Sequence, residues 1–316
     1  MRNIYIAENA KGGGLYRYLL SEDGSVTFCD KTEMDYPMYM ELHDGKMYVL
    51  LDQAFPEDVS ALSVYDMEET GALSACIFKE PTLGVCACHL AVYDDAVYAV
   101  NYLSGSVVKM LDVCRVHTGV CGPQKPRQNA PHTHYVCRTP DEKFTLVTDL
   151  GLDRIFVYDN DLNEVARVVA PAGAGPRHLI FSEDHKTCFC VNELSSTVSA
   201  YAYDNGTLTL LDTVSILPEG FAGTNTAAAI RVHEGLVYAS NRGHNSIACL
   251  SYQDGKLQLL SLTDCGGKGP RDFNIFGDIL VCTNEKSDNV TFFKVQKEKL
   301  QKLPHALTLK GPLCVI

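Results

Sequence analysis

The chain has 316 residues, of which 27 are Lys or Arg and 39 are Asp or Glu, so its formal charge at pH 7 is −12. This acidic balance argues against non-specific binding to nucleic acid or to an anionic membrane, because both need clustered positive charge. With 46% apolar and 21% charged residues, the chain can bury a sizeable core and lacks the composition of a disordered polymer. It contains no apolar run of about 18 residues, so no membrane-spanning helix is expected.

A short apolar segment that ends in Asn or Asp recurs seven times along the chain. These terminal residues, here named the anchor positions, are Asn9, Asp52, Asn101, Asp149, Asn192, Asn241 and Asn284. The steps between consecutive anchors are 43, 49, 48, 43, 49 and 43 residues. A repeat of this length is typical of the blades of a β-propeller.

Each repeat contains four strand-like segments with alternating apolar and polar residues. In the fifth repeat they read RHLIFS, CFCVNE, SSTVSAYAYD and TLTLLDTV, between residues 177 and 214. Turn residues separate these segments, and no long segment has a helical period. The sequence therefore predicts an all-β fold, a seven-bladed propeller of four-stranded blades that spans residues 1–316 as a single domain. A pair of β-sandwiches is the alternative.

The two ends of the chain are expected to meet in one blade. The first repeat, which begins with IYIAEN at residues 4–9, lacks the inner strand that precedes each later anchor. The segment LTLKGPLCVI at residues 307–316 has no anchor after it. We therefore expect the C-terminal strand to complete the first blade and to close the ring.

Polar residues recur near the inner strands, which should converge on the central channel. His132, Arg177 and Arg271 lie where inner strands begin, and Glu193 and Arg242 directly follow anchor positions. Arginine offers a planar fork of donors that fits a carboxylate or a phosphate. Histidine has a pKa near neutrality, and a glutamate can orient it or act as a base itself. Together these residues indicate an acid–base site for an anionic substrate.

Four segments resemble a known family. They are PHTHYVCRTPDEKFTLVTDLGLDRIFVYD, GPRHLIFSEDHKTCFCVNELSSTVSAYAYD, SNRGHNSIACLSY and GPRDFNIFGDILVCTNEKSDNVTFFKV. In these motifs the chain is similar to the seven-bladed β-propeller lactonases, which include the bacterial propeller-type 6-phosphogluconolactonases and, more distantly, the 3-carboxy-cis,cis-muconate lactonising enzymes. The resemblance implies four catalytic residues, His132, Arg177, Glu193 and Arg242, and three substrate-binding residues, Arg177, Arg242 and Arg271. The third repeat departs from the family pattern, since it reads CACHLAVY where a proline more often precedes the histidine.

The resemblance also implies an activity, the hydrolysis of a sugar-acid lactone, with 6-phosphogluconolactone of the pentose phosphate pathway as the substrate. Arg177 and Arg242 would hold the phosphate or polarise the carbonyl, and either His132 or Glu193 would remove a proton from water. No metal or cofactor is expected, and the only expected partner is a small anionic lactone. The protein would be cytoplasmic and either a monomer or a homodimer. The alternatives are a muconate-type lactonising enzyme and a non-catalytic propeller that serves as a protein-binding platform.

Other residues receive structural interpretations. The odd number of cysteines, 13, indicates free thiols in a reducing compartment. Cys86 and Cys88 alternate along one strand and are interpreted as core residues. His134 and His178 are interpreted as structural histidines at the starts of inner strands.

Overall fold

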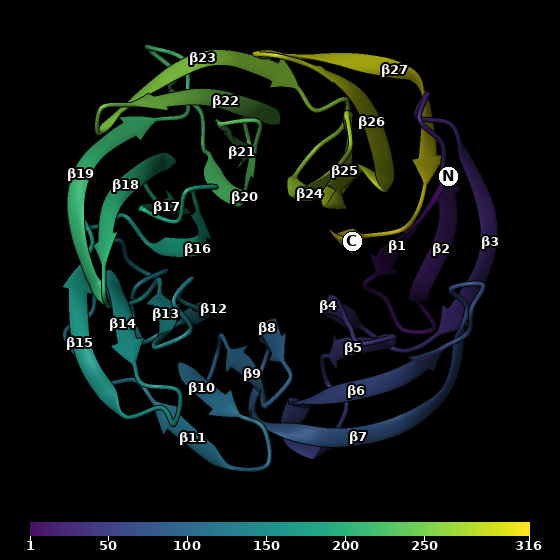
Figure 1. Ribbon diagram of the computed structural model, residues 1–316, viewed down its shortest axis with the longest axis horizontal. Coiled ribbons are helices and arrows are strands. Elements are labelled where there is room, and N and C mark those ends of the chain that lie inside the picture. Colours follow the sequence, from purple (N-terminus) through teal and green to yellow (C-terminus); the bar gives the residue numbers. More distant parts are fainter.

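Seven four-stranded antiparallel sheets surround a central channel (Figure 1). This is the arrangement of a computed structural model that describes residues 1–316. It confirms the predicted all-β, seven-bladed propeller. The only helices are two short 3₁₀ turns, η1 (Pro56–Asp58) and η2 (Glu285–Ser287). Neither is long and apolar enough to cross a membrane.

The strands of each blade follow one another from the channel outward. The first four blades contain β28 (Pro312–Val315), β1 (Arg2–Glu8), β2 (Gly14–Leu20) and β3 (Val26–Glu33); β4 (Pro37–His43), β5 (Lys46–Leu51), β6 (Val59–Met67) and β7 (Leu73–Val85); β8 (Ala87–Tyr93), β9 (Ala96–Asn101), β10 (Ser106–Lys109) and β11 (Val113–Val116); and β12 (Thr133–Arg138), β13 (Thr145–Asp149), β14 (Arg154–Tyr158) and β15 (Glu164–Val169). The last three contain β16 (Pro176–Phe181), β17 (Thr187–Asn192), β18 (Thr197–Asp204) and β19 (Thr207–Ser215); β20 (Thr226–His233), β21 (Leu236–Arg242), β22 (Ser246–Gln253) and β23 (Lys256–Asp264); and β24 (Pro270–Phe276), β25 (Ile279–Asn284), β26 (Asn289–Gln296) and β27 (Lys299–Thr308).

The burial of side chains decreases from the inner strands of a blade to its outermost strand. Every residue of β17 is buried, whereas most of β15 is exposed. The apolar side chains of the inner strands pack between neighbouring blades, so that Phe189 and Val198 of the fifth blade meet Ile230 of the sixth. The core is therefore a ring of interfaces between blades.

The anchor residues explain the repeat that the sequence shows. Five of the seven side chains are buried at strand ends, and those of Asn9 and Asp52 are partly buried. They bind groups there that would otherwise lack partners. Asn101 donates to the backbone oxygen of Thr82 at 2.9 Å, and Asn241 donates to that of Ile216 at 2.7 Å. Because a buried polar group needs a partner, the repeated Asn or Asp stabilises each blade at the same place.

The ends of the chain close the ring as expected. Strand β28 pairs antiparallel with β1, with Val315 opposite Ile6 and Pro312 opposite Glu8. The backbone N–H of Tyr5 donates to the oxygen of Ile316 at 2.8 Å. The closing strand is shorter than the expected segment, because residues 307–308 still belong to β27 of the seventh blade.

All thirteen cysteines are unpaired in the structure, and seven of them are buried. Their redox state in the cell, and the cytoplasmic location inferred from it, stay predictions.

Removal of the closing strand should destabilise the whole ring. Deletion of residues 312–316 exposes an edge of β1 and removes the buried side chains of Leu313 and Val315. Burial of these two side chains alone contributes about 3–6 kcal/mol, so the urea midpoint should fall sharply. Lys310→Ala, an exposed position just before β28, is the control and should unfold like the full chain. A truncated chain with the same midpoint as Lys310→Ala would contradict the closure.

Candidate active site

A cavity of about 570 Å³ opens at one mouth of the central channel. Its walls come from the starts of the innermost strands and from the ends of the second strands. Arg177 lies at the start of β16, Arg242 ends β21, and Glu193 directly follows β17. Since the first two strands of a blade are antiparallel, the start of one lies beside the end of the other, as Pro176 does opposite Asn192. Both groups of residues therefore meet at the same rim.

A break in register, as at a β-bulge, recurs near the start of the inner strand in all seven blades. In the fifth blade, Pro176 pairs with Asn192 and His178 with Val191, so Arg177 is an extra residue without a partner. A bulge turns the side chain of its extra residue away from the regular alternation of the strand. The extra residues of four blades line the cavity, namely Cys88, His134, Arg177 and Arg271.

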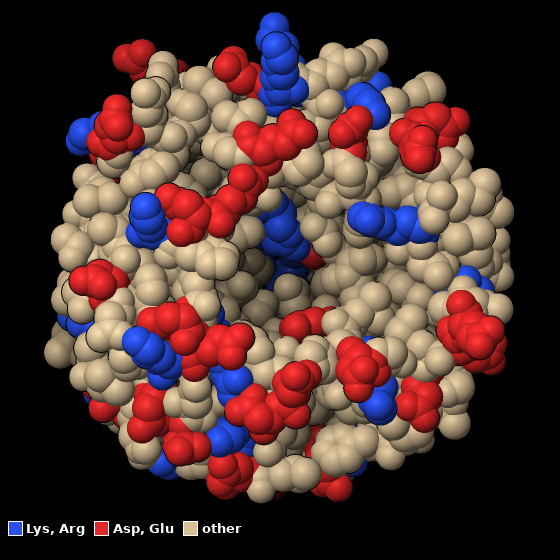
Figure 2. Space-filling model, in the orientation of Figure 1, with Lys and Arg blue, Asp and Glu red and all other residues tan.

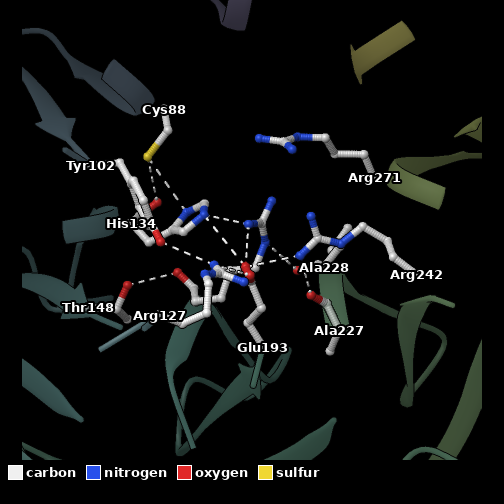
Figure 3. Close-up of polar contacts among 12 residues, drawn as sticks. Cys88, Tyr102, Arg127, His134, Thr148, Glu193, Ala227, Ala228, Arg242 and Arg271 are labelled. Carbon is white, nitrogen blue, oxygen red and sulfur yellow. Dashed lines mark hydrogen bonds and ion pairs between the residues drawn. The ribbon is translucent and has the colours of Figure 1, made fainter. Parts of the chain in front are cut away.

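The carboxylate of Glu193 lies at the centre of the site and is surrounded by three guanidinium groups (Figure 3). Its Oε2 lies 2.7 Å from Nη1 of Arg177 and 3.0 Å from Nη2 of Arg242. Its Oε1 accepts a hydrogen bond of 2.6 Å from Nη2 of Arg127. Arg177 and Arg242 also donate to the backbone oxygens of residues 228 and 227, which fixes their directions.

These contacts determine the charges in the site. Burial alone would raise the pKa of Glu193, but the guanidiniums of Arg242 and Arg177 outweigh it and hold that pKa well below its usual range. Burial lowers the pKa of Arg242 to about 10 in spite of the attraction of Glu193. At neutral pH Glu193 is thus a carboxylate between two cations, and it keeps these buried guanidiniums from repelling each other.

His134 lies beside this ion cluster as a neutral imidazole. Its Nε2 lies 3.9 Å from Oε2 of Glu193 and accepts a short hydrogen bond from Nη1 of Arg177. Because a guanidinium can only donate, Nε2 holds the lone pair and Nδ1 carries the proton, 3.7 Å from Sγ of Cys88. Burial and the charge of Arg177 lower the pKa of His134 well below its usual range.

His132, in contrast, does not line the cavity. Its ring stacks on Tyr102 with centroids 4.4 Å apart, and its Nδ1 lies 3.0 Å from the backbone oxygen of Tyr102. Its backbone N–H donates to Asp149 at 2.9 Å. These contacts fix the ring outside the cavity, whereas the bulge directs His134 into it. The position that we expected for His132 is therefore occupied by His134.

Arg271 faces the cavity from the side opposite Glu193 (Figure 3), and its Nη1 lies 3.4 Å from Oε2 of Glu285. In total, the cavity is lined by five cationic side chains and one carboxylate, Glu193; the cations are Arg127, Arg177, Arg242, Arg271 and Lys286. Figure 2 shows basic side chains inside the central hollow and acidic ones scattered over the surrounding face. The cavity is thus positively charged in an acidic protein, which suits an anionic ligand.

Sequence reasoning missed several residues of this cavity, among them Arg127, Lys286, Cys86 and Cys88. The two cysteines were expected in the core, but both line the cavity. Nothing in the sequence pattern indicated Arg127, because it belongs to the loop between β11 and β12 rather than to a repeated strand. No three His, Cys, Asp or Glu side chains are grouped as metal ligands.

The far end of the channel holds a smaller cavity, of about 310 Å³, which is lined in part by aromatic rings. The ring of His89 lies between those of Tyr39 and Tyr135, with centroids 4.4 and 4.0 Å away. Burial lowers the pKa values of His89 and His178 well below their usual range. Burial has the opposite effect on the carboxyl of Glu41 at this end, since it raises that pKa to about 7.

The three buried histidines should make the fold sensitive to mild acid. His89, His134 and His178 have depressed pKa values in the folded state. Below about pH 6.5 the unfolded chain therefore binds more protons than the folded chain, and the free energy of unfolding decreases as the pH is lowered. Each contributes about 1.4 kcal/mol per pH unit, and the raised pKa of Glu41 offsets one of them. The free energy of unfolding in urea should therefore fall by about 2–3 kcal/mol per pH unit below pH 6.

His89→Gln tests this assignment, because it removes one of the three histidines from the end of the channel that lacks the ion cluster. The slope of stability against pH should decrease by about 1.4 kcal/mol per pH unit in this variant. A free energy of unfolding that stays level between pH 7 and pH 5 would show that these histidines are protonated in the fold.

Similarity to known proteins extends over the whole chain. Residues 3–316 match the family described as lactonase, 7-bladed beta-propeller. An uncharacterized protein of Staphylococcus aureus (strain bovine RF122 / ET3-1) is 32% identical over 346 aligned positions, which cover 100% of both chains.

Solved structures share the fold. A protein from Lactobacillus plantarum superposes with a TM-score of 0.90 at 28% identity, over 100% of this chain and 99% of that one. The periplasmic gluconolactonase PpgL of Pseudomonas aeruginosa superposes with a TM-score of 0.89 at 24% identity, over 99% and 98% of the two chains. The match over residues 3–316 is decisive for the family: the chain belongs to the seven-bladed β-propeller lactonases.

Proposed function

We propose that this protein hydrolyses an anionic sugar lactone, with 6-phosphogluconolactone as the substrate. The observation that carries the proposal is the cationic cavity, in which Arg177 and Arg242 share the carboxylate of Glu193 beside a neutral His134. Membership of the lactonase family supports the reaction class. The positive charge of the cavity supports the choice of a phosphorylated lactone over a neutral one.

Arg177 and Arg242 are suited to stabilise the charge that develops during ring opening. When water adds to the lactone carbonyl, the carbonyl oxygen becomes an oxyanion. Guanidinium donors held by buried contacts need little reorganisation to bind it, and a single donor of this kind contributes about 10²–10³ in rate in other enzymes. Both arginines are held by Glu193 and by backbone oxygens, so their directions are set before substrate binds.

His134 is a better candidate for the base than Glu193. The arginines stabilise the carboxylate of Glu193, which makes it a poor proton acceptor. The Nε2 atom of His134 has a lone pair, which accepts from Nη1 of Arg177 in the empty site. It would become available when Nη1 exchanges this acceptor for a substrate oxygen, while Nε of Arg177 stays on the backbone oxygen of Ala228. His134 would take a proton from the attacking water, and the acyl–oxygen bond of the tetrahedral intermediate would then break. The departing ring oxygen receives the proton as a hydroxyl, and the product is the open carboxylic acid, which ionises at neutral pH.

His134→Gln tests this mechanism. Loss of a general base lowers kcat by about 10²–10⁴, while KM should change little because the arginines remain. The rate is measured as acid release from 6-phosphogluconolactone at constant pH, corrected for spontaneous hydrolysis.

His132→Gln is the matched control, since it removes a neighbouring imidazole that lies outside the cavity. It should retain kcat within about tenfold of the original, well above the loss of a general base. Equal kcat values for His134→Gln and the unmodified protein would remove His134 from the mechanism. Absence of hydrolysis with every lactone tested, charged or neutral, would overturn the proposed function.

A further inference from the structure

The loop between β11 and β12, residues 117–132, brings Arg127 to the cavity. The side chain of Arg127 is 43% exposed, whereas those of Glu193 and Arg177 are 3% and 4% exposed. Its Nη2 donates to Oε1 of Glu193 at 2.6 Å and lies 3.1 Å from the hydroxyl oxygen of Tyr102 (Figure 3). Arg127 is therefore the member of the ion cluster that faces solvent.

The loop that carries Arg127 is held by the next residue, Gln128, which is fully buried. The amide nitrogen of Gln128 donates to the backbone oxygen of Leu150 at 2.8 Å and to Oδ1 of Asp153 at 2.7 Å. Its Oε1 accepts the backbone N–H of Gln124 at 2.9 Å. A Cβ atom at Gly122 would lie 2.2 Å from this same oxygen, so the glycine allows the close packing. The backbone beside Arg127 is thus fixed, and its side chain alone is free to change partner.

Glu193 does not need Arg127 for its charge balance. Arg177 and Arg242 already contact its other oxygen at 2.7 and 3.0 Å. Arg127 gives Glu193 a hydrogen bond through one nitrogen, Nη2, whereas a guanidinium fork on a phosphate or carboxylate forms two strong hydrogen bonds. An anionic ligand in the cavity can therefore replace Glu193 as the partner of Arg127.

The buried arginines are placed differently. Arg177 and Arg242 bind backbone oxygens in the wall of the cavity and are suited to the reacting carbonyl. Arg127 approaches from the solvent side, where the part of the substrate remote from the ring would lie. The site thus contains one guanidinium that is accessible from solvent.

We propose that Arg127 selects anionic substrates: it leaves Glu193 and binds the anionic group that the substrate carries outside the lactone ring. Gln128 is its positioning residue, because it holds the loop from which Arg127 reaches the cavity. This inference rests on the proposed function and names the group that the site recognises, a phosphate or a carboxylate.

The first experiment compares three lactones in Arg127→Gln: 6-phosphogluconolactone, glucarolactone with its free carboxylate, and neutral gluconolactone. The ratio of kcat/KM for an anionic lactone to that for the neutral one should fall by about 10- to 100-fold, the loss expected for hydrogen bonds to a charged group. If the ratio falls more for 6-phosphogluconolactone than for glucarolactone, Arg127 binds a phosphate; the reverse order identifies a carboxylate. Arg127→Lys should restore part of the ratio, since it keeps the charge but not the fork.

Lys294→Gln is the matched control. Lys294 lies in β26, the third strand of the seventh blade, and forms an ion pair with Asp278. Its side chain is 35% exposed, close to the 43% of Arg127. It removes the same charge outside the cavity and should leave the ratio unchanged. An equal loss for all three lactones in Arg127→Gln would show that Arg127 only orients Glu193, and no loss at all would show that it binds nothing; either result overturns the proposal.

A binding measurement separates this inference from the proposed function. If the unmodified protein hydrolyses none of the lactones, the function fails, but calorimetry with 6-phosphogluconate, glucarate and gluconate still tests Arg127. The unmodified protein should bind an anionic compound with a phosphate or second carboxylate more tightly than gluconate, and Arg127→Gln should lose this preference. Gln128→Ala should weaken it too, and a single cooperative melting transition would show that the blades remain folded. Identical preferences in the unmodified protein and in Arg127→Gln would overturn the inference even if a lactone is hydrolysed.

Discussion

Antiparallel pairing between the two innermost strands of each blade determines where Arg177, Glu193 and Arg242 lie in the cavity. The pairing brings the beginning of one strand and the end of the next to the same mouth of the channel, as with Pro176 and Asn192. At that mouth, the bulges direct single residues into the cavity instead of along the strand. Ring closure by β28 then keeps the blades at fixed spacing, so groups far apart in the sequence meet across a few ångströms. The site is thus a product of the ring and not of any single blade.

The ion cluster is stable only as a unit. Removing a carboxylate from between two buried guanidiniums leaves unpaired buried charge, which in other proteins costs about 3–5 kcal/mol. One donor of the cluster is left unpaired, because the buried Nε of Arg242 has no hydrogen-bond partner in the protein. A ligand oxygen that reaches this donor would form a charge-assisted hydrogen bond with it.

The repeat and its anchor residues were sufficient to predict the fold, since they reflect a structural need that recurs in each blade. The family motifs also led to Arg177, Glu193 and Arg242, because these lie at repeated strand positions. They did not separate His132 from His134, since strand alternation alone does not reveal a bulge. A closer alignment of the repeats would have done so: His134 precedes its anchor Asp149 by 15 residues, as Arg177 precedes Asn192 by 15.

Arg127 could not be found in this way. It lies in a loop that belongs to one blade only, and its direction depends on the buried amide of Gln128 and on a close contact at Gly122. Repetition carries no information about such a loop. The position of Arg127 depends on tertiary contacts, which the structure shows and the sequence pattern does not.

In the mechanism that we propose, the charge balance of the site explains how His134, whose pKa is lowered, would accept a proton once an anionic substrate is bound. In the empty cavity, burial and Arg177 keep His134 neutral, and a proton there would add another cation to a cavity that already holds five. An anionic substrate reverses this balance, because it brings negative charge and draws the donor of Arg177 away from Nε2 of His134. Both changes favour the imidazolium form, so they raise the basicity of His134 when water must lose its proton. A neutral lactone would bring the same carbonyl without that charge. The anionic group of the substrate would therefore serve catalysis as well as recognition, and the positive cavity would act on both binding and rate.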